Sequence, residues 1–260
     1  MTEKIFQIDA FADTVFTGNP ASVIILQSWP VDKVLQAIAM ENNQAETAFA
    51  IPKGNDFELR WFTPTIEVRL CGHATLATAH VIFTNYSYPN DSIRFHTLSG
   101  ILTTTKISND KYLLDFPSDF IIPYDKILLQ DVLPINIKEA YIGKDDILAI
   151  LHDEDEVKLF TPDFSKISML PSRGLIISAS SKEHDIVSRC FYPQSGVDED
   201  AATGSAHTLL TPYWALKLRK NSIDAIQWSK RRGYLHCVFK GERTSLIGKA
   251  ITYLVGEIYI

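Results

Sequence analysis

The chain has 260 residues, of which 46% are hydrophobic and 22% are charged. This apolar content can build a folded core, so an intrinsically disordered chain is excluded. At about 150 residues per domain, the length predicts one large domain or two small ones. The 25 basic and 31 acidic residues give a net charge of −6. We therefore expect neither a nucleic-acid partner nor a membrane partner.

The N-terminus and the cysteines predict a cytoplasmic protein. No long apolar stretch with a small-residue cleavage site follows Met1, so no signal peptide is expected. No apolar run reaches the roughly 18 residues that a membrane-spanning helix needs. Cys71, Cys190 and Cys237 are widely spaced and odd in number, which argues against a disulfide framework and a paired-cysteine metal site. Since no two histidines lie four residues apart, no metal site is expected.

Short β-type runs dominate the first part of the chain. They occupy residues 5–11, 21–26, 45–51, 57–61, 93–98, 101–107 and 112–116. A helix is predicted over residues 31–39, where apolar residues recur at the spacing of one helical face. Ser28, just before this segment, is its expected cap.

Three prolines between Pro117 and Pro134 mark the predicted junction of two domains. The domains are expected at residues 1–118 and 119–260, with the last strand able to pack on the N-terminal half. Further β-type runs follow at residues 175–178, 187–192, 234–239, 245–247, 251–255 and 257–260. Because helices do not alternate one-for-one with these strands, a doubly wound parallel sheet is disfavoured.

Two helix starts resemble each other. Cys71-Gly72-His73-Ala74 and Thr203-Gly204-Ser205-Ala206 each precede an apolar helix and lie about half the chain apart. The pattern predicts two similar halves, each with a helix that begins at a glycine. The free N–H groups and positive dipole at such a start favour an anion. The alternative is that each glycine only allows tight packing.

Glu46 is the candidate general acid/base. In a strand over residues 45–51 it shares one face with Ala48 and Ala50, which leave space around its carboxylate. A carboxylate among apolar neighbours holds its proton more tightly, which suits proton transfer. The alternative is a solvated glutamate at the start of a strand.

His73 and Asp200 each allow two interpretations. The helix dipole disfavours a charged His73, so we expect a neutral imidazole that exchanges a proton or merely packs locally. Asp200 ends an acidic run, which is either a solvated turn or helix cap, or a catalytic position. His80 and His207 lie within the helices and are interpreted as core or surface residues. The dinucleotide, P-loop and GxSxG hydrolase fingerprints are all absent from the sequence.

Together, these segments resemble the phenazine-biosynthesis PhzF-like isomerase family. The matching segments run in order over nearly the whole chain: Asp9–Phe11, Phe16–Ala21, Ala45–Phe49, Phe62–Pro64, Glu67–Thr75, Leu114–Pro117, Glu199–His207 and Gln227–Ser229. Two positions depart from the family pattern. Ala201 stands where the family usually has proline, and Arg232 stands where a glycine is expected.

The resemblance implies the α+β fold of the diaminopimelate-epimerase-like superfamily. Two similar halves, each a strand-rich barrel-like roll around a central helix, would form the active site in the cleft between them. The implied catalytic residues are Glu46 as acid/base with His73, Asp200 and Ser205. The implied substrate-binding residues are Asn19, Gly72, Thr203 and Gly204. The family also implies a homodimer that needs no metal or organic cofactor.

Two functions follow from the sequence. The first is a cofactor-independent isomerase that moves a proton on a small carboxylate-bearing metabolite. The alternative is a non-catalytic metabolite- or partner-binding protein on the same scaffold. The presence of all four catalytic residue types favours the enzyme. Cysteine-based epimerases of the superfamily use a thiol from each half, but here the counterpart of Cys71 is Thr203. The carboxylate of Glu46 is therefore expected to carry the proton.

Overall fold

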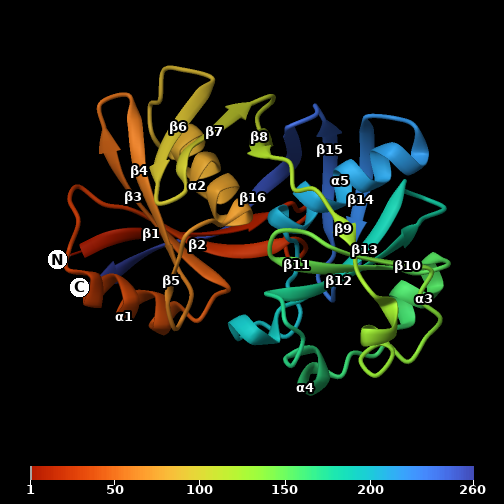
Figure 1. The fold of residues 1–260 in the computed structure, drawn as a ribbon. Helices are drawn as coiled ribbons and strands as arrows, with labels where there is room; N and C mark the ends of the chain where they lie inside the picture. The colour runs from red at the N-terminus through yellow and green to blue at the C-terminus, as the bar shows by residue number, and fades with distance from the viewer. Residues whose placement is uncertain (1) are drawn as a thin grey trace. The chain divides into compact units, whose positions relative to one another are not determined.

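The computed structural model describes residues 2–260, which form two compact units. The first unit comprises the chain up to Asp115 together with Ile247–Ile260, and the second comprises Phe116–Leu246. Strand β16 (Arg243–Tyr259) starts in the second unit and continues in the first (Figure 1). The first unit thus contains residues 247–260, which the sequence analysis placed in the segment 119–260 while allowing the last strand to pack elsewhere.

The first unit is a closed ring of eight strands. The ring order is β1-β2-β3-β4-β6-β7-β8-β16, and β16 pairs with β1 to close it. The elements are β1 (Thr2–Ala10), β2 (Asn19–Ile25), α1 (Asp32–Asn42), β3 (Glu46–Lys53), β4 (Asp56–Phe62), β5 (Glu67–Val68), α2 (Gly72–Asn85), β6 (Ser92–Thr97), β7 (Gly100–Lys106) and β8 (Lys111–Pro117). Closure leaves the ring without a free strand edge.

Helix α2 is buried along nearly its whole length. Residues 72–82 are all buried, and strands β1, β2, β3 and β7 contact the helix (Figure 1). Small residues allow the strands to approach closely. The hydroxyls of Thr75 and Thr78 donate to the carbonyls of Cys71 and Ala74, so these buried polar groups are satisfied within the helix. A helix that is apolar on all its faces is typically buried in the core of a protein, as α2 is here.

The second unit repeats the topology of the first. Its elements are β9 (Ile122–Pro123), η1 (Lys126–Leu129), β10 (Glu139–Ile142), β11 (Asp146–Ile150), α3 (Glu154–Leu159), α4 (Phe164–Ile167), β12 (Gly174–Ser180), β13 (Ile186–Phe191), η2 (Pro193–Ser195), α5 (Gly204–Leu218), β14 (Ser222–Gln227) and β15 (Gly233–Phe239). The parallel pairs β11/β12 and β13/β14 correspond to β2/β3 and β4/β6. Helices α2 and α5 each connect the second parallel pair, so the predicted two-half α+β fold is confirmed.

Helix α5 contains Pro212 in its buried interior. Proline has no N–H, so the carbonyl of Thr208, four residues earlier, loses its helical partner. The backbone N–H of Asp119 donates to that carbonyl at 3.0 Å. The segment that enters the second unit therefore satisfies the acceptor that the proline leaves open.

Two details of the sequence-based assignment are wrong. Ser28 does not cap the first helix: Val31 occupies the N-cap, because Pro30 disfavours a helical conformation at the residue before it. The three runs expected after Ser245 are one continuous strand, β16, paired with β1. Gly248 lies within this continuous strand. A Cβ at that position would lie 2.3 Å from the ring of Phe11. The glycine makes room for that buried ring.

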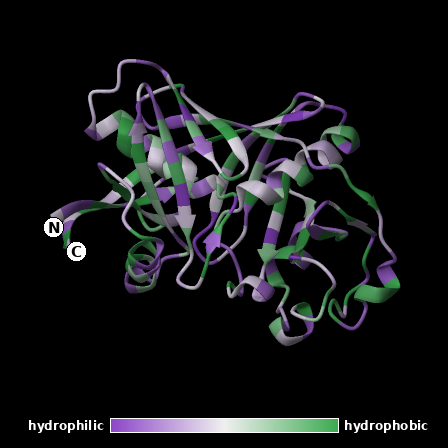
Figure 2. Ribbon diagram, turned by 60° about the vertical axis from the view of Figure 1, so that its left-hand side comes forward, coloured by the Kyte–Doolittle hydropathy of each residue, from purple (hydrophilic) through white to green (hydrophobic). Residues whose placement is uncertain are grey.

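The strands carry alternating hydrophilic and hydrophobic residues over much of their length (Figure 2). On β3, Phe49 packs against Leu35 and Ile38 of α1, outside the ring. Because side chains alternate along a strand, the even-numbered residues of β3, including Glu46, lie on the other face, towards α2. Within the described residues, no helix combines the length and apolar character needed to cross a membrane.

The first prediction concerns the enclosed helix. Replacing Leu76, which is fully buried on α2, with alanine should lower the free energy of unfolding by about 2–5 kcal/mol, because the ring cannot collapse onto the cavity. Leu159→Ala is the control, since Leu159 is 80% exposed, and should change stability by less than about 0.5 kcal/mol. Urea denaturation of both variants measures the difference; equal losses would mean that α2 is not enclosed.

Candidate active site

Glu46 and His73 meet where strand β3 and helix α2 both begin. Glu46 is the first residue of β3, on the face opposite Phe49, and His73 is the second residue of α2. Their side chains are 17% and 5% exposed, and Oε2 of Glu46 lies 3.1 Å from Nε2 of His73. The ring N–H is poorly aligned with the carboxylate, so this is a close ion-pair approach rather than a well-formed hydrogen bond.

The other nitrogen of His73 has two neighbours. Nδ2 of Asn19, the first residue of β2, lies 3.2 Å from Nδ1, and Sγ of Cys71 lies 3.5 Å from it. A side-chain amide nitrogen can only donate, so the Nδ1 that faces Asn19 can accept only while the ring is neutral, with its proton on Nε2 beside Glu46. A charged ring carries a proton on both nitrogens.

The charge of His73 is opposite to what the helix dipole alone predicts. Burial opposes the imidazolium, but negative charge beside it, on the Cys71 sulfur when that ionises and on the carboxylate of Glu46, favours it and raises the pKa of His73 well above its usual value. The expectation of a neutral ring is therefore wrong. The dipole acts weakly here compared with a carboxylate at 3.1 Å. Burial and the carboxylate of Glu46 raise the pKa of the Cys71 thiol, which keeps it protonated at neutral pH.

Glu46, Cys71 and His73 form a compact donor group. One ligand atom from each lies within 4.8 Å of the others, close enough for all three to bind one metal ion. A search for histidine spacing could not find this group, because its members come from β3 and α2 and meet only in the fold. The expectation that the protein uses no metal stays a prediction.

Asp200, the candidate in the second unit, lies in a loop that its own neighbours hold. Its carboxylate accepts from the hydroxyl of Thr203 and from the backbone N–H of Ala201 at 3.0 Å. Proline, the family's usual residue at 201, has no N–H, so this chain gains a hydrogen bond to Asp200 at the position where it departs from the pattern.

Gln227 ties this loop to strand β14. Its Nε2 donates to the carbonyl of Asp200 at 2.7 Å, and its Oε1 accepts from the backbone N–H of Thr203 at 2.8 Å. Gln227 belongs to a matching segment, but no sequence pattern assigned it a role. Its function is positional: it fixes the loop that carries Asp200 and Thr203 just before Gly204 begins α5.

Ser205 contacts a cation that the sequence analysis missed. Nη2 of Arg173 donates to Oγ of Ser205 at 3.1 Å, and the same guanidinium pairs with Asp146. No motif signals Arg173, because it lies between the matching segments. The predicted residues thus form two sets. Asn19, Glu46, Gly72 and His73 gather in the first unit, while Asp200, Thr203, Gly204 and Ser205 gather in the second.

His80 and His207 are structural residues. His80 bonds the hydroxyls of Tyr112 and Thr252, each at 2.9 Å, and His207 donates from Nδ1 to the carbonyl of Thr203 at 2.8 Å. Burial lowers the pKa of each to about 4. Both rings are therefore neutral at physiological pH.

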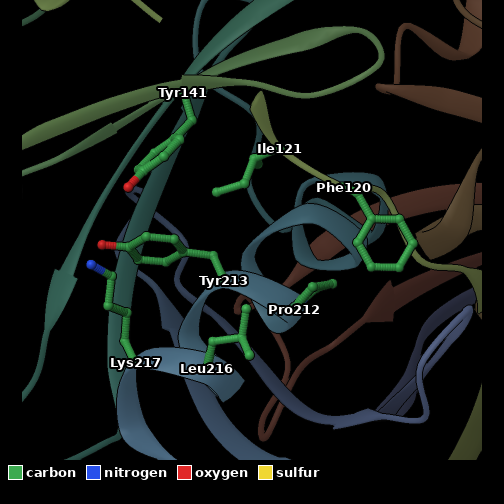
Figure 3. A pocket seen from close by; sticks show the side chains of 7 residues that line it. All are labelled: Phe120, Ile121, Tyr141, Pro212, Tyr213, Leu216 and Lys217. Atoms are coloured by element: carbon green, nitrogen blue, oxygen red, sulfur yellow. The ribbon is translucent and has the colours of Figure 1, made fainter. Parts of the chain in front are cut away.

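A separate pocket of about 240 Å³ lies on the second unit, beside the C-terminal part of α5 (Figure 3). It is lined by Phe120, Ile121, Tyr141, Pro212, Tyr213, Leu216 and Lys217. Its polar groups are already engaged, because Tyr141, Tyr213 and Lys217 all donate to the carboxylate of Glu139. The pocket contains none of the predicted catalytic residues and is not the candidate active site.

Comparisons with known proteins agree on one family. The profile of the phenazine biosynthesis-like protein family matches residues 8–256. An uncharacterized isomerase of Pseudomonas aeruginosa is 45% identical over 264 residues, covering 100% of both chains. The crystal structure of a PhzF family protein from Enterococcus faecalis has a TM-score of 0.94 at 42% identity and covers 100% of both chains. A hydroxyproline epimerase from Agrobacterium vitis shares the fold alone, with a TM-score of 0.65 at 8% identity, covering 99% of this chain and 92% of the other.

The second prediction concerns the pH dependence of His73. An NMR titration should show that the ring holds its proton to a pH above 6.5, and Glu46→Gln should lower this pKa by removing the neighbouring charge. A raised pKa stabilises the fold fully below the unfolded value near 6.5, and that stabilisation is lost as pH rises through the folded pKa. Glu46→Gln should therefore lose stability mainly at acidic to neutral pH. Glu41→Gln, an exposed control, should change neither quantity; a His73 pKa unaffected by Glu46→Gln would contradict the pairing.

Proposed function

We propose that this chain, which belongs to the phenazine biosynthesis-like family and is an isomerase, moves a proton between two carbons of a small carboxylate-bearing metabolite. Glu46 is the proposed acid/base. The observation that carries the proposal is the approach of its carboxylate to His73, 3.1 Å away at the start of a buried helix. A carboxylate that is mostly buried, yet still partly accessible, is placed to exchange a proton with a bound substrate.

His73 is the proposed partner of Glu46 in each step. When Glu46 takes a proton from one carbon, its carboxylate becomes neutral, and the imidazolium of His73 loses the negative charge beside it. When Glu46 returns the proton to a second carbon, the ion pair is restored. One carboxylate can do both only if both carbons are reached from the same side of the substrate. Asp200 and Ser205 are proposed as polar partners from the second unit.

The starts of α2 and α5 are the proposed carboxylate-binding groups. Gly72 and Gly204 each open a buried helix, and their free N–H groups favour negative charge. The negative charge that develops when a carbon next to a carboxylate loses a proton would be stabilised by the same groups. Asn19 and Thr203, which adjoin these starts, complete the proposed binding set.

A thiol mechanism is less well supported than the carboxylate mechanism. Epimerisation by two thiols needs one cysteine on each side of the carbon, and Thr203 occupies the position of the second. The remaining thiol, Cys71, is buried with a raised pKa. A threonine hydroxyl does not ionise near neutral pH, so no opposed acid/base pair can form.

Location, oligomeric state and cofactor use complete the proposal. We propose a cytoplasmic protein, because Cys71, Cys190 and Cys237 are free and buried. A homodimer and independence from cofactors follow the family expectation. A non-catalytic binding protein is the alternative, and it makes no use of the Glu46–His73 pair.

The third prediction tests proton transfer directly. A library of small carboxylates is incubated with the protein in deuterium oxide, and deuterium incorporation is measured by mass spectrometry. The wild type should label its substrate, and Glu46→Gln should lose nearly all labelling while binding the substrate with similar affinity, because only the proton-transfer group is removed. Glu41→Gln should label normally. Labelling by Glu46→Gln at the rate of the wild type would refute the mechanism. Binding of a carboxylate without labelling by either protein would favour the binding function.

The fourth prediction separates the carboxylate from the thiol. Cys71→Ala removes the sulfur 3.5 Å from His73 and should retain most of the labelling activity, because the thiol carries no proton in the proposed reaction. The protein should not epimerise diaminopimelate. Epimerisation of that compound, abolished by alkylation of Cys71, would replace the carboxylate mechanism with a thiol one.

A further inference from the structure

Arg173 and Asp146 form an ion pair at the start of two parallel strands of the second unit. Asp146 is the first residue of β11 and Arg173 directly precedes β12, so the parallel register, which pairs Asp146 with Gly174, brings them together. Nε donates to Oδ1 at 2.9 Å, and Nη2 donates to Oδ2. The carboxylate is 4% exposed and the arginine side chain 37%. A bidentate pair of this kind fixes the plane of the guanidinium.

The guanidinium of Arg173 has further N–H donors besides those that bond to Asp146. Nη2 also donates to Oγ of Ser205, but Nη1 has no hydrogen-bond partner among the described residues. Ser205 accepts this bond, so its own hydroxyl hydrogen remains available, and it too has no acceptor in the part of the chain that the structure describes. Arg173 and Ser205 therefore present unused donors side by side on a partly exposed face.

Tyr192 supports the arginine from one side. The guanidinium carbon lies 5.1 Å from the centre of its ring, and the ring is buried. Gly174 makes this packing possible, because a Cβ at residue 174 would lie 2.2 Å from the tyrosine ring. Asp146, Gly174 and Tyr192 together hold Arg173 in one orientation, so little conformational entropy is lost when it binds a ligand.

The repeated topology gives the arrangement a counterpart. In the first unit, Glu46 at the start of β3 contacts His73, the residue after the glycine that opens α2. In the second unit, Arg173 before the equivalent strand β12 contacts Ser205, the residue after the glycine that opens α5. The two units thus carry opposite charges at corresponding places. The acidic residue, Glu46, suits proton transfer, and the basic residue, Arg173, suits the binding of an anion.

We propose that Arg173 binds the carboxylate of the substrate, with Ser205 as a second donor, and that Asp146 is a positioning residue that acts through Arg173. The proposal rests on the proposed function and names how its substrate is recognised. The two oxygens of a carboxylate would accept hydrogen bonds from the Nη edge of Arg173 and from the hydroxyl of Ser205. A planar guanidinium matches this geometry, whereas a lysine ammonium supplies only a point charge.

The test measures binding without turnover. Benzoate and itaconate, each beside the uncharged compound in which amides replace its carboxylates, are titrated into the full-length protein, and the Nε–H of Arg173 and the backbone amide of Ser205 are followed by NMR. The wild type should bind at least one carboxylate saturably and its amide more weakly. Arg173→Met should weaken carboxylate binding about 10- to 100-fold and leave amide binding unchanged. Arg173→Lys should fall between them.

Two further variants complete the test. Asp146→Asn should weaken carboxylate binding but leave amide binding unchanged, which a general loss of structure would not do. Arg94→Met is the matched control, because Arg94 also pairs with an aspartate but is 61% exposed on β6, and it should bind like the wild type. Circular dichroism confirms folding, and Arg173→Lys keeps the test decisive should Arg173→Met fail to fold.

The proposal is overturned by either of two results. One is a folded Arg173 variant that binds carboxylates as tightly as the wild type. The other is a wild type in which no carboxylate of the panel shifts the signals of Arg173 and Ser205. Because binding is measured at equilibrium, a failure of deuterium labelling would overturn the proposed reaction without affecting this result.

Discussion

The enclosure of a helix by a ring of strands is the constraint on which the rest of the first unit depends. Strands can close around α2 because its buried polar groups have partners: Thr75 and Thr78 bond to their own helix, and His80 bonds the hydroxyls of Tyr112 and Thr252. The N-terminal N–H groups of such a helix have no further turn to bond to. Where the helix begins, β3 supplies Glu46 and β2 supplies Asn19, and both side chains contact the ring of His73. The candidate site is therefore placed by the same packing that forms the core.

The repeated topology explains how one architecture can carry two different chemistries. The strand order and the crossover helices of the two units correspond, but the residues at equivalent strand starts differ in charge. A buried carboxylate needs a cationic neighbour, and the first unit uses a histidine, whose side chain can lose its proton. The second unit uses Arg173, whose charge is permanent. A reversible charge suits proton exchange, and a permanent one suits the binding of an anion.

Local patterns in the sequence predicted the elements that position the site, but not the contacts between them. The alternation over residues 45–51 predicted the strand and the face of Glu46, and the shared glycine pattern predicted two equivalent helices. Gln227 and Arg173 could not be predicted in this way, because each acts on a loop or helix start distant in the chain. Strand β16 was predicted as three runs, but it is continuous, and its Gly248 makes room for the ring of Phe11, a contact that only the fold shows. The charge of His73 was misjudged for the same reason, since its carboxylate neighbour comes from another element.

The surroundings of Cys71, the thiol at the candidate site, disfavour a thiol mechanism. Cys71 occupies a position from which a thiol could act, but it lies beside a carboxylate and away from water, and both factors favour the neutral form. Glu46 and Cys71 also compete for the same imidazole, which can stabilise one negative charge fully but not two. The carboxylate of Glu46 lies 3.1 Å from Nε2 of His73, whereas burial raises the pKa of the Cys71 thiol and keeps it protonated. Because a thiolate beside the Glu46–His73 pair would place two anions around one cation, we propose Glu46 rather than Cys71 as the proton-transfer group.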